Sequence, residues 1–168
     1  MTPIEIFILA VFGLLVLVSY GLYLKNTVPN TNYFNNQYWF GMPENLVKIL
    51  TFFQILAVVG FIVAISSWIM NPPTKGIMSK YLFITLLFFF ISAALWAYAV
   101  NKDITWLVIS SLIVTAICSI LMLAGSIEEN NPRIHIVLGL LFLCIVTVLG
   151  DGVLWNANYI IKSKTNYM

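Results

Sequence analysis

A single carboxylate, Asp151, lies inside a stretch that is otherwise apolar enough to be embedded in lipid, residues 144–159. A charged side chain at such a depth costs at least about 2.5 kcal/mol, so it faces protein or water and usually has a partner. If the stretch is a helix, residues at steps of three or four share one stripe with Asp151. Those residues are Cys144, Thr147, Trp155 and Asn158. This stripe is the candidate site.

Lys48 is the candidate partner of this carboxylate. It lies near the start of the second apolar run, and in an antiparallel bundle that position has a depth similar to that of Asp151. Gly150 and Gly152 flank the Asp and let another backbone or a ligand come close. Three interpretations are open: a polar clasp between two helices, a carboxylate that contacts a ligand or water, and a relay for protons or ions.

The side chains that enzymes use for catalysis are scarce. His135 is the one histidine, and it stands at the other end of the same apolar run from Asp151. The sequence contains no HExxH, no GxSxG and no Gly-rich phosphate loop. With one His and no CxxC, a two-histidine haem site or a four-ligand zinc site is also disfavoured. We therefore expect a protein that is not an enzyme and has no assigned cofactor.

The composition places these residues in a membrane protein. Of the 168 residues, 61% are hydrophobic and 8% are charged, and the mean hydropathy is +0.99, so the lipid bilayer is the expected partner. The eight basic residues are scattered, which does not predict binding to nucleic acid. Five apolar runs are long enough to cross a bilayer. They cover residues 3–24, 46–70, 81–100, 104–125 and 134–161.

These runs predict an all-α integral membrane protein, a bundle of five transmembrane helices that forms a single domain over residues 1–168. The turn at residues 101–103 is so short that the third and fourth helices must be antiparallel neighbours. Small polar residues recur every four positions in the fourth span, at Ser111, Thr115 and Ser119. This ladder is most simply a surface for close helix packing.

Residues 25–45 form the one long loop, and it is rich in Asn and aromatic residues. It is too apolar for a free linker, so we expect it on the mouth of the bundle or at the membrane interface. Trp39 and Phe40 would then belong either to an interfacial aromatic belt or to a lid over a ligand.

The distribution of basic residues predicts the orientation. One side of the membrane would carry Lys25, Lys48, Lys102, Lys162 and Lys164, and the other Lys75, Lys80 and Arg133. Because cytosolic loops are enriched in Lys and Arg, this bias favours an amino terminus outside and a carboxyl terminus in the cytosol.

The layout resembles the TspO/translocator (tryptophan-rich sensory protein) family in length, in span number and in its one long aromatic loop. Local similarities are Pro43 followed by a span with Gly60, Ala94-Leu95-Trp96, Trp106, and Asn158-Tyr159 near the end. The sequence departs from the family at Ala93 and Ala157, where Asn and Leu are typical. The resemblance implies a protein that binds planar or sterol-like apolar molecules, such as tetrapyrroles, between the helices and under the long loop.

Binding of a small apolar or amphipathic ligand in such a pocket is the leading functional hypothesis. Its expected ligand-binding residues are Trp39 and Phe40 in the lid, Trp96 and Trp155 in the walls, Asn158 at the polar end, and Lys48 and Asp151 beside it. One alternative is an ion or proton channel or transporter subunit that uses Asp151. A five-span chain would normally form a homo-oligomer to enclose a pore. The other alternative is a structural membrane subunit.

Overall fold

The computed structural model describes residues 1–27, 42–128 and 133–165, and this part of the chain is helical, without strands. Four helices precede a composite fifth one. The elements are α1 (Pro3–Thr27), α2 (Glu44–Met70), α3 (Gly76–Asn101), α4 (Thr105–Ile127), α5 (Ile134–Cys144), η3 (Ile145–Trp155) and α6 (Asn156–Thr165). The last three run on without a break, so α5, η3 and part of α6 make one span, Ile134–Ile161.

All five spans are long and apolar enough to cross a bilayer, which confirms the prediction of a multi-pass, all-α integral membrane protein. The observed helices begin and end within a few residues of the predicted runs, except that α3 begins at Gly76, five residues before the predicted position 81. Its first turn, with Ser79 and Lys80, is polar, so hydropathy alone does not include it. The Glu128 carboxylate accepts a hydrogen bond from the Ile77 N–H at 3.4 Å in this turn.

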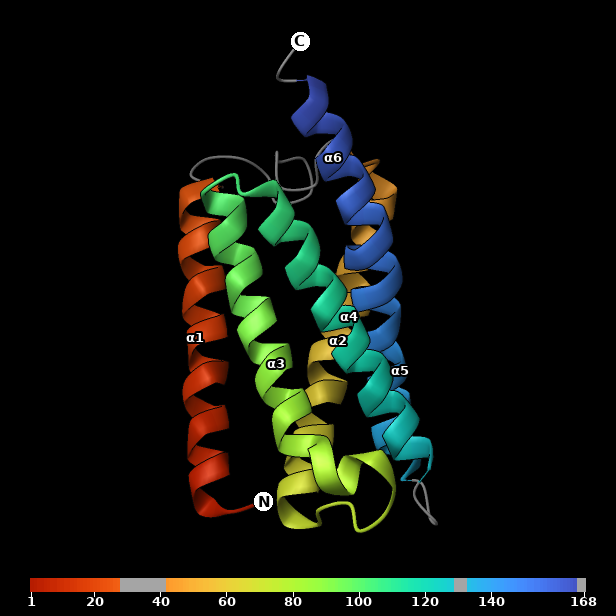
Figure 1. Ribbon diagram of the computed structural model, residues 1–168. Coiled ribbons are helices and arrows are strands. Elements are labelled where there is room, and N and C mark those ends of the chain that lie inside the picture. Colours follow the sequence, from red (N-terminus) through yellow and green to blue (C-terminus); the bar gives the residue numbers. More distant parts are fainter. Residues whose placement is uncertain (28–41, 129–132, 166–168) are drawn as a thin grey trace.

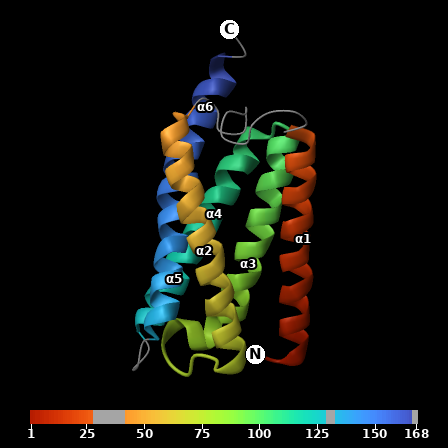
Figure 2. The same cartoon turned by 180° about the vertical axis from the view of Figure 1, so that it is seen from behind.

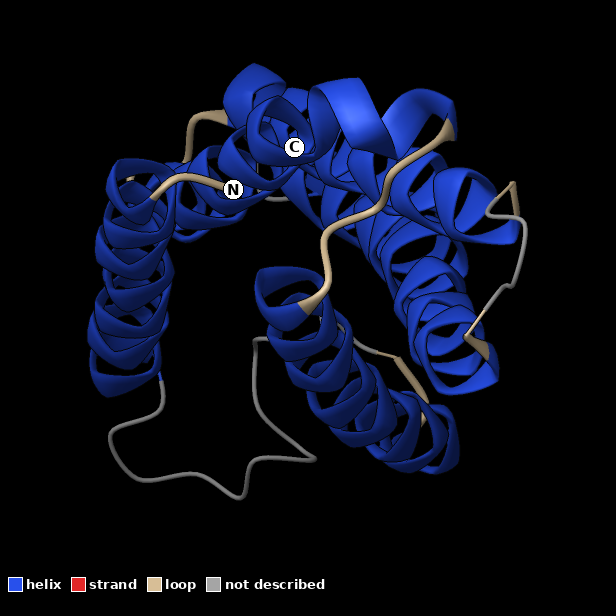
Figure 3. Cartoon of the chain, turned by 90° about the horizontal axis from the view of Figure 1, so that it is seen from below, coloured by secondary structure: helices blue, strands red, loops and turns tan. Residues whose placement is uncertain are grey.

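The helices pack in the spatial order α1, α3, α4, α5 and α2. The short turn after Asn101 makes α3 and α4 antiparallel neighbours, as predicted, and α1 lies against the outer side of α3 (Figure 1, Figure 2). Seen along the bundle, α1 and α2 stand apart from one another (Figure 3). The amino terminus and α6 lie at opposite ends of the bundle, which we call the N-pole and the C-pole.

The crossing of α2 and α5 depends on two glycines. A Cβ atom added to Gly139 would lie 2.7 Å from the Cα of Gly60, and one added to Gly60 would meet the Gly139 backbone in turn. Absence of side chains is what allows two membrane helices to approach this closely and to gain van der Waals contact. The pair therefore fixes α2 against α5 near the middle of the bundle.

Hydroxyl groups join α4 to both of its neighbours. Ser92 and Thr115 are hydrogen-bonded at 2.8 Å between α3 and α4, and Ser119 and Thr147 at 2.6 Å between α4 and η3. All four side chains are buried. Such bonds in membrane proteins contribute about 0.6 kcal/mol each. The predicted packing role of the small-residue ladder on α4 is thus confirmed, with hydrogen bonds added.

At the N-pole, the side chain of Arg133 forms hydrogen bonds with carbonyl groups at the end of α2. The Arg133 guanidinium donates to the carbonyl oxygens of Asn71 at 2.9 Å and Ser67 at 3.3 Å, at the end of α2. A cation at a helix C-terminus is favourable because the last carbonyl groups carry partial negative charge. Arg133 therefore links the start of α5 to the end of α2 from outside the apolar region.

Replacing Gly139 by Ala should push α2 away from α5, because its Cβ has no space beside Gly60. Overpacking of this kind costs about 1–3 kcal/mol. We expect a lower thermal unfolding midpoint for detergent-purified Gly139→Ala. The matched control is Gly21→Ala, where an added Cβ has nothing within 4 Å and Ala gains about 1 kcal/mol in helix propensity. Equal midpoints for the two variants would contradict the close crossing.

Candidate functional site

The segment that contains Asp151 is a π-helix, Ile145–Trp155. Its backbone N–H groups bond to carbonyl oxygens five residues back. At its end, the backbone N–H of Asn156 donates to the backbone carbonyl oxygen of Asp151. The prediction of an α-helix is wrong for these eleven residues. Gly150 and Gly152 help to explain the difference, because residues without side chains tolerate the wider turn. π-helical segments are rare in proteins overall, and those that do occur are often found at functional sites.

Asp151 lies on the inner side of this π-helix. A π-helical turn takes about four to five residues, and Thr147 and Trp155, four positions away on either side, are both buried. Leu149 and Val153 are each 55% exposed and form the outer, lipid-facing side. Asp151 itself is partly exposed. The predicted stripe therefore does face the interior, although the helix is of a different type.

Trp96 and Trp155, which were expected in the walls of a ligand pocket, contact one another in a packed core. Their ring centroids lie 5.3 Å apart in an edge-to-face arrangement, and Trp155 stacks on Tyr159 at 5.1 Å. Tyr20 of α1 contacts Trp96 at 5.1 Å. Trp96 and Trp155 are only 3% and 2% exposed. They join α1, α3 and the fifth span at the C-pole.

This aromatic cluster also reaches the turn between α3 and α4. The Tyr159 hydroxyl donates a 2.9 Å hydrogen bond to the Asp103 carboxylate. Asp103 has a φ of +54°, which the tight turn requires and which Asp tolerates better than most residues. Neither Tyr20 nor Tyr159 was among the expected ligand-binding residues, although Tyr159 belongs to the Asn158-Tyr159 pair that resembles the TspO/translocator family.

The remaining candidates are dispersed. Lys48 forms an ion pair with Glu44 at 2.6 Å, one turn away on the surface of α2, so the expected pairing with Asp151 is not observed. Asn158 donates from its amide to the Leu154 carbonyl at 2.8 Å and so bonds to its own helix. Trp39 and Phe40, the expected lid residues, lie outside the described residues.

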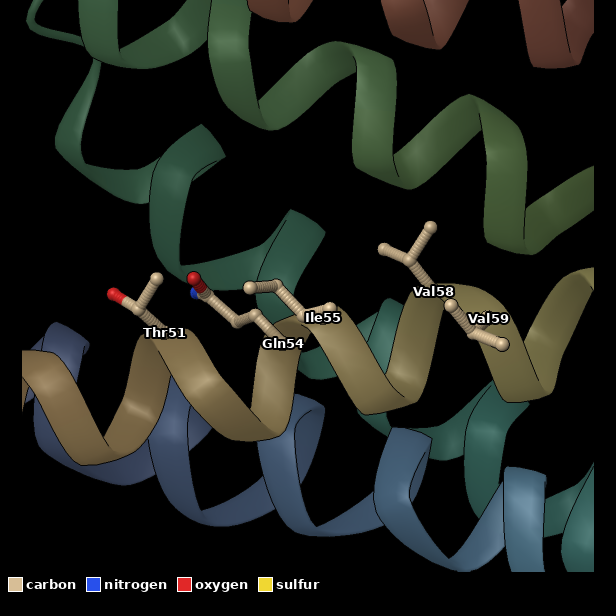
Figure 4. A pocket seen from close by; sticks show the side chains of 5 residues that line it. All are labelled: Thr51, Gln54, Ile55, Val58 and Val59. Carbon is tan, nitrogen blue, oxygen red and sulfur yellow. The ribbon is translucent and has the colours of Figure 1, made fainter.

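A cavity of about 300 Å³ lies along α2, lined by Thr51, Gln54, Ile55, Val58 and Val59. Figure 4 shows Thr51, Gln54, Ile55 and Val58 on the side of α2 away from α5 and η3. Its lining is mostly apolar, and the side chains of Ile55, Val58 and Val59 are more than half exposed. The α2 face that does not pack on α5 therefore carries the hollow.

Gln54 is the polar residue of this cavity that sequence reasoning missed as a site residue. Its side chain is partly buried, and the structure gives its amide no hydrogen-bond partner among the described residues. The nearby Thr51 hydroxyl, by contrast, donates to the Val47 carbonyl at 2.8 Å. Gln54 is the one amide residue within the predicted span 46–70, so the argument applied to Asp151 would also have found it.

The described residues contain no group of three or more His, Cys, Asp and Glu side chains placed to hold a metal ion. Comparison of the chain with protein-family models, with curated proteins and with solved structures finds no match.

Replacing Trp155 by Ala should destabilise the protein whether or not a ligand is present, because its indole is packed between Trp96 and Tyr159. Large-to-small changes of a buried Trp cost about 3–5 kcal/mol. Trp106→Ala is the matched control, since Trp106 is 71% exposed and surface changes stay within about 0.5 kcal/mol. Thermal unfolding in detergent measures both. A Trp155→Ala protein as stable as the control would contradict a structural role for the cluster.

Proposed function

We propose that this membrane protein binds a small, mostly apolar molecule that carries a hydrogen-bonding group, of a sterol-like or tetrapyrrole-like kind, in the cavity along α2. The observation that supports this proposal most is the position of Gln54 in a mostly apolar hollow, whose other polar residue, Thr51, bonds to its own helix. The layout that resembles the TspO/translocator family favours the same class of ligand.

The Gln54 amide needs a partner at its depth. Gln54 lies ten residues after Glu44, so it is about 15 Å along the helix from the start of α2 at 1.5 Å per residue. An amide placed in an apolar medium without a hydrogen bond costs roughly 2–7 kcal/mol. A ligand with a carbonyl, hydroxyl or pyrrole N–H group would satisfy the amide there, while lipid chains would not.

The rest of the cavity would hold part of the apolar body of such a ligand, and the remainder would lie against lipid. Its volume of about 300 Å³ is at the lower end of the range of small-molecule sites. Ile55, Val58 and Val59 are 59%, 58% and 56% exposed and so would lie against the ligand or against lipid chains. A ligand dissolved in the bilayer would reach this exposed face of α2 sideways from the lipid, without passing through water.

The orientation belongs to the same proposal. Five basic residues belong to the C-pole by their place in the sequence, against three at the N-pole. The C-pole set is Lys25, Lys48, Lys102, Lys162 and Lys164, and the N-pole set is Lys75, Lys80 and Arg133. The positive-inside rule therefore favours a cytosolic C-pole and an amino terminus outside. The ligand cavity would then lie in the half of the membrane nearer the cytosol, since Thr51 and Gln54 belong to the first part of α2.

Two variants test the cavity. Val58→Phe should fill the hollow and abolish ligand binding, and Gln54→Leu should weaken it about 5- to 10-fold, because one lost hydrogen bond is worth about 1–1.5 kcal/mol. The matched control is Ile49→Phe, which adds the same ring on α2 at a position that is 54% exposed and outside the cavity lining.

The measurement is quenching of intrinsic Trp fluorescence by protoporphyrin, together with thermal stabilisation by cholesterol, for each purified full-length protein. We expect the control to behave like the wild type. Binding that is lost in Ile49→Phe but kept in Val58→Phe would place the ligand elsewhere. No binding of either probe to the wild type would remove the support for this ligand class.

A further inference from the structure

We propose that the π-helical segment holds an alkali-metal cation between the Asp151 carboxylate and the side-chain oxygen of Asn156. This site is separate from the cavity along α2 and does not depend on ligand binding there. Two independent observations carry it: a carboxylate on the inner side of a membrane span, and a buried amide oxygen one π-turn further along.

No described cation balances the charge of Asp151. Within the described residues no ion pair includes Asp151, and the one lysine of α2, Lys48, pairs with Glu44. The α4 sequence has no charged residue, and the one ionisable group of α5 besides Cys144, His135, stands at its N-pole end. Lys162 and Lys164 follow on α6, where their side chains are not described. A bare carboxylate facing the interior of a membrane bundle calls for a cation.

Asn156 points to the same position. Its N–H bonds to the Asp151 carbonyl, which places it one π-turn after Asp151, and its amide nitrogen donates to the Gly152 carbonyl at 3.2 Å. Its amide group therefore lies against the turn that carries the carboxylate. Asn156 is only 6% exposed, and its Oδ1 is buried without a hydrogen-bond partner among the described residues. A buried acceptor left unpaired costs about as much as a lost hydrogen bond.

Further oxygen atoms lie one turn earlier. Thr147 is four residues before Asp151, and its hydroxyl is hydrogen-bonded to Ser119 at 2.6 Å. Each hydroxyl oxygen has two lone pairs, so this pair keeps acceptor capacity. Side-chain and backbone oxygens beside an irregular stretch of membrane helix are the groups that hold Na⁺ in transporters.

One carboxylate together with neutral oxygen atoms favours a monovalent cation over a divalent one. Only one carboxylate is present, whereas Ca²⁺ and Mg²⁺ sites use several oxygen ligands with more negative charge. Zinc and other transition metals need His or Cys ligands, and no such cluster occurs in the described part of the chain. One negative charge balanced by one alkali cation leaves the site neutral within the apolar span.

The test compares thermal unfolding of the detergent-purified, full-length protein in NaCl, in KCl and in choline chloride, at one pH and one ionic strength. A cation that binds only the folded state should raise the unfolding midpoint of the wild type by about 5–10 °C at a hundredfold excess over its Kd. Asp151→Asn and Asn156→Ala should both lose this difference. Asn158→Ala is the matched control and should keep it, because the Asn158 amide bonds to Leu154 instead.

Equilibrium binding of ²²Na⁺ and of ⁸⁶Rb⁺, a K⁺ substitute, to the wild type gives a second readout that does not need a folded variant. Saturable binding of either isotope, displaced by the matching unlabelled salt, supports the proposal. It is overturned if neither isotope binds, if Asp151→Asn responds to the salts as the wild type does, or if acid alone stabilises the wild type and the alkali salts do not.

Discussion

The close crossing of α2 and α5 at Gly60 and Gly139 is the contact on which the rest of this structure depends. A membrane offers no hydrophobic driving force between helices, so α2 is held by van der Waals contact at this point and by Arg133 at the N-pole. Because one face of α2 packs against α5, the opposite face around residues 51–59 is left open. That open side is where the cavity lies, and the same packing brings Leu50 against Gly150, beside Asp151.

Polar groups inside the bundle mostly find partners inside it. The hydroxyls of α3, α4 and η3 bond to one another or to carbonyls of their own helices. Gln54 and Asn156 depart from this rule, and each lies in one of the two places where we propose a ligand or an ion. The indole N–H of Trp68 is also buried without a partner among the described residues, but it belongs to the packed core near the N-pole.

Much of the fold was predictable because hydropathy reports directly on which residues can lie in lipid. The five spans follow from hydropathy, and the inward position of Asp151 follows from the cost of a charge in lipid. The antiparallel pairing of α3 with α4 follows instead from the short turn at residues 101–103. The π-helix was not predictable from the sequence. In residues 145–155, steps of four residues place the same side chains on the interior face in an α-helix and in a π-helix. The ion pair of Lys48 with Glu44 was missed because a partner one turn away competes better than one on another helix. Trp96 and Trp155 were expected to line a ligand pocket, but hydropathy does not distinguish two indoles that line a cavity from two that fill it, and in the structure they pack against one another.

The most direct test of the central claim, a lateral ligand site on α2, is photo-crosslinking. A photoactivatable sterol would be added to the purified protein in lipid nanodiscs, irradiated, and its adducts located by mass spectrometry. The account predicts adducts concentrated at residues 51–59 of α2 and competed away by unlabelled sterol. Adducts spread evenly over the exposed apolar residues of α1 and α2, without competition, would contradict it, because they would show only a surface that contacts lipid.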